Sequence, residues 1–532
     1  MQKLYVFAIG GSGERVMYSF IMSLVAGTPI DAQEVIPVFI DNDTTSKALT
    51  NCLELINAYR DSYDGRANKL QGVNSLYARA LGANPDIWPT FCRAIIDEPV
   101  ILNVSGQQIS DLEGIIGCPN NTTDSTLQRV AAEKNLLFTN DDLSMELNVG
   151  FVGNPNIGSV VLNTLSLNMS EFKDDILGKV SAADGVFVVG SLFGGTGAAG
   201  FPLIVNKFSE NVGAAGKPLV GGVAVLPYFT TAGQDTSGII DTERWDVQSG
   251  TFAAKTRAAL MYYDKYMTHM DYLYYVGDDN VSTYNHSVGG VHQDNPANLV
   301  DLMAAMSIID FAKQQRPESI VYKVPTWGFT DKTGTTSNLS GIPDIGMRRA
   351  FAKFFLTKTI FEKDCFLKYN IENHHEHVAN IGFTEGMRMA VIDENSLKQL
   401  PVASGLNRIF KLWDIWWADL SSNPNNSRHL LVFPKDLDIT PSNVTTKFYT
   451  PADQTGHNWG IAKTHIDGII HRRAVANDPK ISNELIAAYK SLFPNGREED
   501  KANFTPDRKL ATLLQIISIG LDNVINTNCS IN

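Results

Sequence analysis

The chain has 532 residues, 44% of them hydrophobic and 19% charged, with a formal net charge of −13. Its length predicts two or more structural units, and its composition is that of a globular protein. The acidic balance disfavours nucleic acid as a partner, because phosphate backbones attract basic surfaces. No apolar run approaches the roughly 18 residues of a membrane-spanning helix.

We also expect a cytoplasmic protein. The segment Met1–Phe7 runs directly into a strand-like pattern and lacks the regions of a signal peptide. Five cysteines are scattered along the chain, and no pair has the spacing of metal ligands. Such a set predicts reduced thiols, as in the cytosol.

The first predicted unit is a strand, a glycine-rich turn and a helix. Leu4–Ile9 is an apolar run, and a helical pattern covers Glu14–Leu24. Glycines let backbone N–H groups approach an anion, and a helix N-terminus attracts negative charge. The turn between them therefore predicts phosphate contacts at Gly10, Gly11, Ser12 and Gly13.

Two familiar phosphate motifs do not fit this turn. The dinucleotide pattern G-x-G-x-x-G would need glycine at Val16, and a Walker A lysine is absent. A dinucleotide-dependent oxidoreductase is therefore the least favoured alternative. The next apolar run, Val35–Ile40, predicts a second strand that ends near Asp43. Asp43 is predicted to contact ribose or water-bound Mg²⁺, to cap the following helix, or to do both.

The segment Gly150–Gly158 predicts another phosphate loop. It contains Gly153 and Asn154, followed by proline. Its backbone amides can surround a terminal phosphate, and the Asn154 side chain can donate a further hydrogen bond. The alternative is an ordinary Gly/Asn/Pro turn. Residues 47–145, which precede this loop, are predicted to be an insertion that is mainly helical.

The most informative segment follows the apolar strand Gly185–Val189. A helix-compatible stretch covers Pro202–Phe208, and the turn between the two is rich in glycine. The Thr196 hydroxyl adds a donor to the backbone amides. The alternative is a tight strand-to-helix turn without a ligand. The predicted phosphate contacts in this turn are Gly194, Gly195, Thr196 and Gly197.

This turn resembles the signature loop of the tubulin/FtsZ superfamily, G-G-G-T-G-[ST]-G, and most closely that of divergent bacterial tubulin-like proteins. The central Gly-Gly-Thr-Gly is intact, whereas Phe193, Ala198 and Ala199 depart from the pattern. The turn after Ile9 resembles the V-G-G-A-G-G-N loop of FtsZ. Gly150–Gly158 resembles its G-A-G-A-N-P-x-x-G loop.

The resemblance implies an α/β fold with a Rossmann-like parallel sheet flanked by helices and a long central helix. It covers residues 1–315 apart from the insertion and assigns them to a GTP-binding domain. Residues 316–532 lie beyond the resemblance, and their local patterns predict a mixed α+β domain. The remaining elements expected in the first domain are strands at Leu219–Pro227 and Tyr272–Val276, a helix at Gly250–Tyr266 and the central helix at Leu299–Phe311.

The resemblance also implies ligands and partners. GTP or GDP with Mg²⁺ would be the cofactors, and the chain would associate with itself into filaments or oligomers. Asn298 is the first candidate to read the guanine edge and Asn295 the second. The alternative is a plain helix cap, with Pro296 near the first turn. One acid of the loop after Pro227 is expected to touch ribose, and the choice stays open among Asp235, Asp241 and Glu243.

One family feature is missing. The acidic N-x-D-x-x-D loop that positions the attacking water in FtsZ has no match at Ser319–Val324, and the nearest acids are Glu318 and Asp331. Binding is therefore favoured over hydrolysis, and no catalytic residue is assigned. The alternative is a hydrolysis-deficient scaffold, for example in a bacterial defence or conflict system, whose C-terminal region binds a protein partner.

The C-terminal region has only local patterns. Three tryptophans at i, i+3 and i+4 predict a buried helix face in preference to a partner interface. The tract His374–His377 is interpreted as a solvated segment in preference to a metal site. Predicted strands are Met387–Ile392 and Leu430–Phe433, and predicted helices are Met347–Phe361, Leu406–Leu420 and Ser482–Leu492.

Overall fold

The computed structural model divides the chain into two compact units. The first comprises Met1–Phe20, Asp31–Leu53 and Ile96–Pro325, and the second Ile21–Ile30, Glu54–Ile95 and Thr326–Asn532. The described residues are 1–43, 45–62, 95–102, 111–118, 120–145, 147, 151, 153–164, 172–210, 216–232, 251–267, 270–278, 282–285, 295–329, 337–340, 346–347, 350–351, 353–354, 357–358, 401–422, 450–452, 458–460, 487–488, 491 and 518–523.

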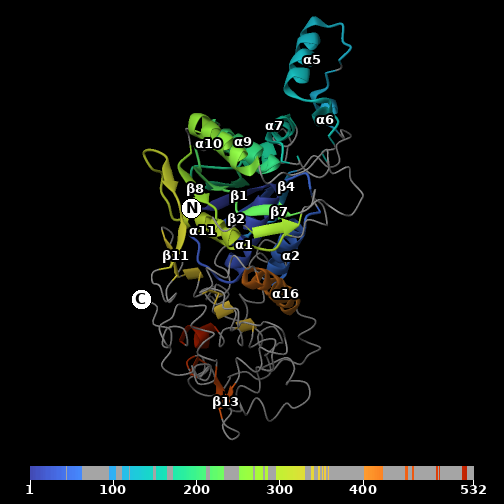
Figure 1. Ribbon diagram of the computed structural model, residues 1–532. Coiled ribbons are helices and arrows are strands. Elements are labelled where there is room, and N and C mark those ends of the chain that lie inside the picture. Colours follow the sequence, from blue (N-terminus) through green and yellow to red (C-terminus); the bar gives the residue numbers. More distant parts are fainter. Residues whose placement is uncertain are drawn as a thin grey trace. The chain divides into compact units, whose positions relative to one another are not determined.

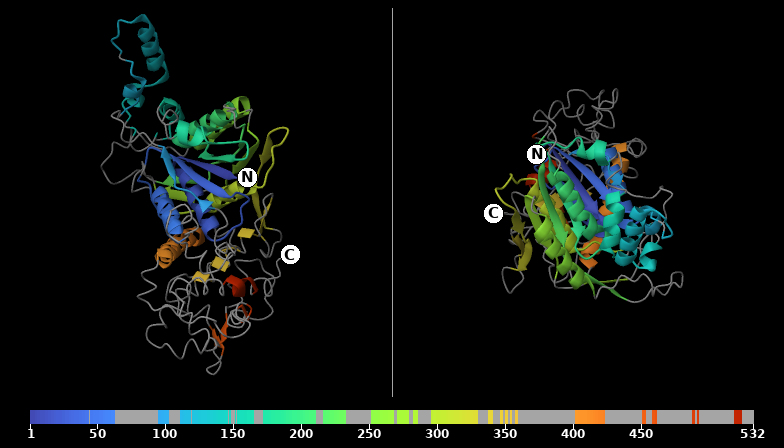
Figure 2. Two further views of the ribbon diagram at one scale, coloured as in Figure 1. Left: turned by 180° about the vertical axis from the view of Figure 1, so that it is seen from behind. Right: turned by 90° about the horizontal axis from the view of Figure 1, so that it is seen from above.

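An eight-stranded sheet forms the centre of the first unit, in the order β10-β8-β6-β5-β1-β2-β3, with β4 also paired to β2 (Figures 1 and 2). The described registers from β10 to β2, and that of β4 on β2, are parallel. The expected α/β class with a parallel sheet is confirmed. The strands are β1 (Lys3–Ile9), β2 (Glu34–Ile40), β3 (Ile95–Ile96), β4 (Val100–Leu102), β5 (Gly185–Ser191), β6 (Leu219–Val225), β8 (Tyr272–Val276) and β10 (Val321–Lys323).

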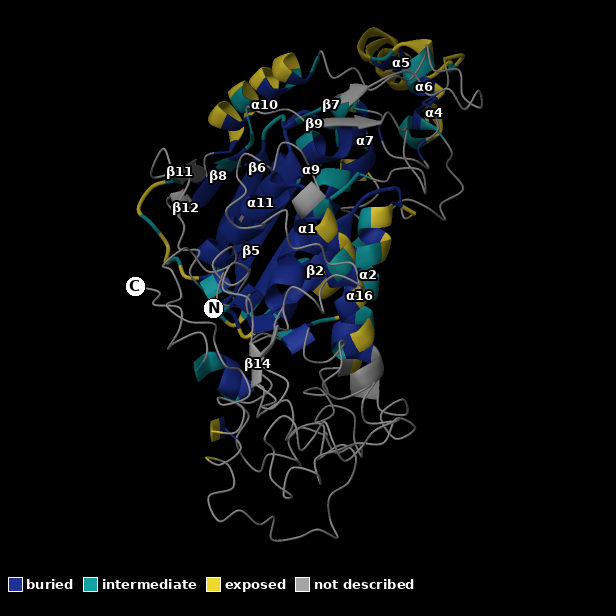
Figure 3. Cartoon of the chain, turned by 60° about the horizontal axis from the view of Figure 1, so that its bottom comes forward, coloured by how far each residue is buried: buried dark blue, intermediate teal, exposed yellow. Residues whose placement is uncertain are grey.

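The central strands are apolar because both faces of the sheet are covered by helices. Residues 4–9 of β1 and all of β5 and β6 are buried. Three helices, α7 (Pro155–Thr164), α9 (Gly195–Glu210) and α10 (Phe252–Tyr266), lie over one face, and α1 (Gly10–Val25) and α11 (Leu299–Phe311) over the other (Figure 1). Every residue of α11 is buried, as expected for a helix that is apolar on all sides (Figure 3).

Both glycine-rich turns belong to helices. The sequence predicts helix starts at Glu14 and Pro202, but α1 begins at Gly10 and α9 at Gly195. Pro202 therefore lies inside α9, where it cannot donate to the carbonyl of Ala198. The Tyr263 hydroxyl donates to that carbonyl instead, at 3.4 Å.

The region 47–145 is not only helical. Its described helices are α2 (Lys47–Ser62), α4 (Leu112–Ile116), α5 (Ser125–Leu137) and α6 (Asn140–Leu143). Its strands β3 and β4 extend the central sheet, and Val100 pairs with Val38. The expectation of a mainly helical insertion misses these strands, because two or three apolar residues have no readable periodicity. A further parallel pair, β7 (Phe229–Ala232) with β9 (Ser282–Asn285), lies outside the central sheet.

In the second unit, the long helix α16 (Pro401–Ser422) contains the predicted helix Leu406–Leu420. Trp413, Trp416 and Trp417 are each 0% exposed, which confirms the buried face. Two antiparallel pairs are described, β11 (Thr326–Phe329) with β12 (Ser337–Ser340) and β13 (Thr450–Ala452) with β14 (Asn458–Gly460).

Several predictions lie outside the described residues. They are the strands Met387–Ile392 and Leu430–Phe433, the tract His374–His377, and most of the helix Ser482–Leu492. Within the described part of the chain, none of the helices combines the length and hydropathy needed to cross a membrane.

Candidate functional site

The candidate site lies where the chain changes direction across the sheet. From β1 the chain continues to β2 on one side, whereas β5 pairs with the other side of β1. In open α/β sheets, ligands bind outside the carboxyl ends of strands at such a switch point. Gly10 directly follows β1, and Gly194 and Gly195 follow β5 after a two-residue turn. The two glycine-rich turns therefore start from neighbouring strand ends.

These two turns touch. A Cβ atom built on Gly10 would lie 3.2 Å from the Thr196 Cβ and 3.3 Å from the Gly197 backbone N. Gly10 also has a φ of 70°, which favours glycine. Gly11, Ser12 and Gly13 continue the first turn of α1. The structure thus brings together two predicted phosphate contacts that are more than 180 residues apart.

The predicted loop at Gly153 and Asn154 joins them. A Cβ on Gly195 would lie 2.9 Å from the Asn154 backbone N and 3.1 Å from the Gly153 N. Helix α7 begins immediately afterwards, at Pro155. The N-termini of α1, α7 and α9 therefore meet near the same strand ends. This arrangement concentrates amide donors and the positive ends of three helices, which favours an anion.

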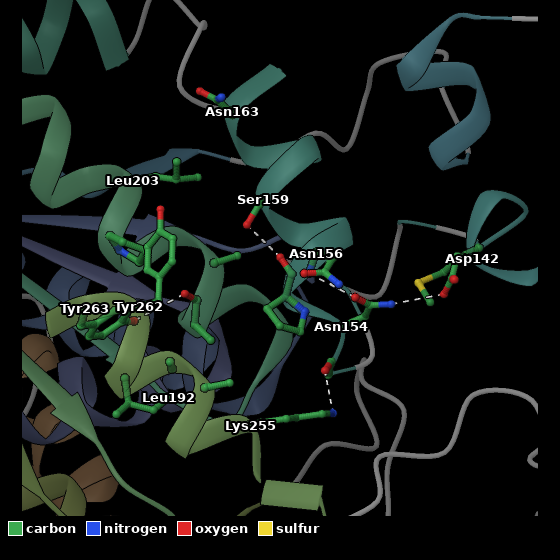
Figure 4. A pocket seen from close by; sticks show the side chains of 18 residues that line it. Asp142, Asn154, Asn156, Ser159, Asn163, Leu192, Leu203, Lys255, Tyr262 and Tyr263 are labelled. Carbon is green, nitrogen blue, oxygen red and sulfur yellow. Dashed lines mark hydrogen bonds between the residues drawn. The ribbon is translucent and has the colours of Figure 1, made fainter. Parts of the chain in front are cut away.

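The side chain of Asn154 has a structural role. Its Oδ1 accepts from the backbone N of Asn156 at 3.1 Å and of Ile157 at 3.4 Å, so it caps α7 (Figure 4). Its Nδ2 donates to Asp142 Oδ1 at 3.2 Å. The turn interpretation of Asn154 is therefore observed. Its backbone amide is the part that faces Gly195.

Two of the residues that depart from the signature loop pack against neighbouring side chains or helices. The Phe193 ring lies 4.7 Å from that of Phe252 and 5.4 Å from that of Phe229, centroid to centroid. Ala199 packs against α7, because its Cβ lies 3.0 Å from a Cβ built on Gly158. These substitutions change the surroundings of the turn. The Gly-Gly-Thr-Gly centre is unchanged.

Three buried carboxylates follow the ends of β1 and β2. Glu14 is in the second turn of α1, and Asp41 and Asp43 follow β2. Burial raises the pKa of Asp41 to about 7 and that of Glu14 well above its usual range. Ser46 Oγ donates to Glu14 Oε2, while Glu14 Oε1 has no hydrogen-bond partner among the described residues. Burial therefore favours the protonated forms of Glu14 and Asp41.

Asp43 is not the cap of the next helix. Its Oδ1 accepts from the backbone N and the hydroxyl of Thr45, at 3.0 and 2.9 Å. The cap of α2 is Ser46, whose Oγ accepts from the Leu49 N at 3.2 Å. The capping alternative for Asp43 is therefore wrong, and the ribose or Mg²⁺ contact stays a prediction.

The raised pKa of Asp41 predicts a pH-dependent stability. Its pKa is about 7 in the folded chain against an ordinary 3.8, so the folded state binds more protons between these values. The stability that the protonated Asp41 carboxyl contributes is complete at low pH and is lost as pH rises through 7. We expect Asp41→Asn to stabilise the chain by on the order of 2 kcal/mol near pH 8 and by much less near pH 5. Thermal unfolding at both pH values measures the difference.

The matched control is Asp174→Asn, at an exposed carboxylate. It should leave the midpoint of thermal unfolding unchanged at both pH values. Equal stabilisation of Asp41→Asn at both pH values would contradict the raised pKa.

A buried polar cluster lies beside the first glycine turn. The Arg15 Nη2 donates to the Tyr228 hydroxyl at 2.8 Å and to Ser12 Oγ at 3.1 Å. The Tyr228 hydroxyl donates to Asp301 Oδ1 at 3.0 Å, and Arg15 Nε lies 3.8 Å from Asp301 Oδ2. This cluster was not predicted from the sequence. A charged pair, Glu14 and Arg15, within an otherwise apolar helix was the available signal.

The same cluster reaches the predicted base-reading residue. Asn298 is the N-cap of α11: its Oδ1 accepts from the Val300 N at 3.0 Å, and its own N donates to Asp301 Oδ2 at 2.9 Å. The cap interpretation of Asn298 is therefore observed. Asn295 is half-buried. The ribose candidates Asp235, Asp241 and Glu243 lie outside the described residues, as does Asp331, whereas Glu318 is exposed.

The residues present fit a phosphate group better than a protein-held metal. Side chains at Gly10 and Gly195 would meet the neighbouring turns, and a Cβ on Gly197 would lie 2.7 Å from the Ser191 N at the end of β5. Only glycine therefore allows these backbones to approach one another this closely. No group of three or more His, Cys, Asp or Glu among the described residues could hold a metal ion. Mg²⁺ does not need such a cage, because it is commonly held by one or two carboxylates together with phosphates.

The comparisons with known proteins do not assign the chain to a family. No protein-family model matches it, and no curated protein does. Among the solved structures that match is "CetZ2 from Haloferax volcanii - GTPgS bound protofilament". That match is 14% identical, covers 59% of this chain and 58% of the CetZ2 chain, and has a TM-score of 0.27.

Proposed function

We propose that the chain is a tubulin/FtsZ-type protein that binds GTP or GDP at the carboxyl edge of its sheet. The observation that carries the proposal is the meeting of three glycine turns from distant parts of the sequence, at residues 10–13, 153–154 and 194–197. Each turn opens a helix, so amide donors and helix dipoles converge on one place. A structural turn explains one such segment but gives no reason for three at one switch point.

Each part of the cradle has a defined task in this proposal. The backbone amides of Gly10–Gly13 and Gly194–Gly197 hold the phosphate oxygens, and that of Gly153 lies on the third side. The neighbouring Asn154 amide already donates to the Phe151 carbonyl at 2.7 Å. The Thr196 hydroxyl adds one donor. Mg²⁺ would neutralise phosphate charge when bound, with Asp43 as the nearby carboxylate that contacts its water shell.

The base would lie toward the start of α11. Asn298 is the first candidate for the guanine edge and Asn295 the second. Because the Asn298 Oδ1 already caps α11, recognition through its side chain must be compatible with that cap. The Arg15–Tyr228–Asp301 cluster fixes the position of this helix start relative to Ser12.

We further propose that bound nucleotide promotes self-association into oligomers or filaments in the cytoplasm, with slow or absent hydrolysis. The segment Ser319–Val324, which includes strand β10, has no acid and so no match to the N-x-D-x-x-D pattern. The same observation favours a second candidate, a scaffold that does not hydrolyse GTP and whose second unit binds a protein partner.

The first experiment identifies the nucleotide. Acid extraction of the purified chain followed by chromatography should yield GTP or GDP at nearly one per chain, and titration should rank GTP above ATP and NAD. Stoichiometric GTP or GDP would support the cradle. Absence of any nucleotide, together with no measurable affinity for the three, would overturn the proposal.

A further inference from the structure

A groove on the outer face of the first unit lies beside the proposed phosphate cradle and shares the Gly153–Asn154 turn with it. It has a volume of about 780 Å³ and lies among helices α7, α9 and α10 (Figure 4). Neither the turn at Gly10–Gly13 nor that at Gly194–Gly197 lines it. Its volume is within the range of sites that bind small organic molecules.

The floor of the groove is apolar and made of small side chains. Ala199, Pro202 and Leu203 of α9 line one side, and Ala259 of α10 lies among the residues opposite. Tyr262, which is 45% exposed, adds an aromatic ring to the lining. Small side chains beside an exposed ring leave room for a flat apolar group, which aromatic side chains bind by offset stacking.

The groove contains one cation that lacks a counterion. Lys255 Nζ donates to the Gly153 carbonyl at 2.8 Å, and no carboxylate among the described residues pairs with it. Asp142, the acid of the lining, is already engaged: Oδ1 accepts from Asn154, and Oδ2 accepts from the backbone N and hydroxyl of Thr139. Burial lowers the pKa of Lys255, which a bound anion would reverse.

We propose that this groove binds a small aromatic anion, with its ring on the α9 floor beside Tyr262 and its carboxylate or sulfonate on Lys255. The apolar floor supplies the affinity for the ring, and the half-buried ammonium selects a negative charge. Binding of the aromatic anion does not require a bound nucleotide.

The position of Lys255 also links the groove to the cradle. Its ammonium holds the carbonyl of Gly153, whose φ is 71° and whose amide lies against Gly195. An anion on Lys255 competes with that carbonyl, so it shifts the Gly153–Asn154 turn and changes nucleotide affinity. This second step rests on the proposed function.

A matched pair of fluorescent probes tests the site on the full chain. Anilinonaphthalene sulfonate carries the anion, and phenylnaphthylamine has a similar ring system without it. We expect saturable sulfonate binding at one site per chain. Lys255→Met should weaken the sulfonate about tenfold and the neutral probe less than about twofold.

Two further variants complete the test. Lys265→Met removes an exposed lysine of the same helix and should change neither probe. Ala259→Trp fills the groove and should weaken both, with circular dichroism confirming an unchanged fold. Equal sulfonate affinity in wild type and Lys255→Met, or binding that Ala259→Trp leaves intact, would overturn the site.

Coupling is measured separately, by titrating GTP with and without the sulfonate. A change of GTP affinity in wild type but not in Lys255→Met supports the coupling, and an unchanged affinity overturns it. If the chain binds no nucleotide, the proposed function fails, whereas the probe titrations still decide the groove site.

Discussion

Gly195→Ala is expected to lower the affinity for GTP about a hundredfold or more. The new Cβ would lie 2.9 Å from the Asn154 N, 3.0 Å from the Phe151 Cβ and 3.1 Å from the Gly153 N. Two of these atoms are backbone, so the contact is relieved only by separating the start of α9 from the 153–154 turn. That movement opens the cradle between two of its three sides. Titration of a fluorescent GTP analogue measures the loss.

The control is a glycine with a similar contact outside the site. A Cβ on Gly178 would lie 3.2 Å from the Lys173 carbonyl, and this glycine is exposed. Gly178→Ala should therefore bind GTP like the wild type. Thr196→Ala removes one hydroxyl donor without moving the backbone, so it should lower the affinity for GTP about tenfold. Wild-type affinity in a folded Gly195→Ala chain would show that the phosphates do not lie between these turns.

The apolar strands were predictable because a parallel sheet covered on both faces requires continuous apolar runs. Leu4–Ile9 and Val35–Ile40 fall within β1 and β2. Short strands were not predictable. Ile95–Ile96 and Val100–Leu102 become strands through pairing with distant residues of β2, a long-range effect that local pattern does not contain.

The helix starts were misplaced because glycine has a low helix propensity, which tertiary packing overrides here. A Cβ on Gly13 would lie 2.8 Å from the Ala8 carbonyl carbon, and one on Gly200 would lie 2.7 Å from the Ile9 Cγ2. These glycines allow α1 and α9 to lie close to β1. Close packing therefore explains Gly13 and Gly200.

The candidate site was predictable where a motif is local and was missed where it depends on distant residues. The three glycine turns are visible as sequence patterns, and the fold brings them together. The acids Glu14 and Asp41 and the cluster of Arg15 with Tyr228 are defined only by burial and by contacts across the unit. The capping of α11 by Asn298 was foreseen as an alternative, and the structure shows it.

Arg15→Met is expected to destabilise the chain by about 3–5 kcal/mol near pH 8, because it leaves a buried carboxylate without its cation. Arg15 is 5% exposed and Asp301 is 0% exposed. Burial raises the pKa of Asp301, and the Arg15 charge opposes that rise. The variant also loses the hydrogen bonds to Tyr228 and Ser12. Chemical denaturation followed by circular dichroism measures the cost.

The pH dependence of this variant separates a charge effect from lost packing. Without Arg15 the pKa of Asp301 rises further, so the folded state gains a proton that the unfolded state releases near neutral pH. Stability of Arg15→Met should therefore be greater near pH 5 than near pH 8. The double variant Arg15→Met with Asp301→Asn should recover most of the loss, since an amide needs no counterion. A loss equal at both pH values and unchanged in the double variant would mean that Arg15 acts through its packing against Tyr228 and Phe229, over whose rings it lies.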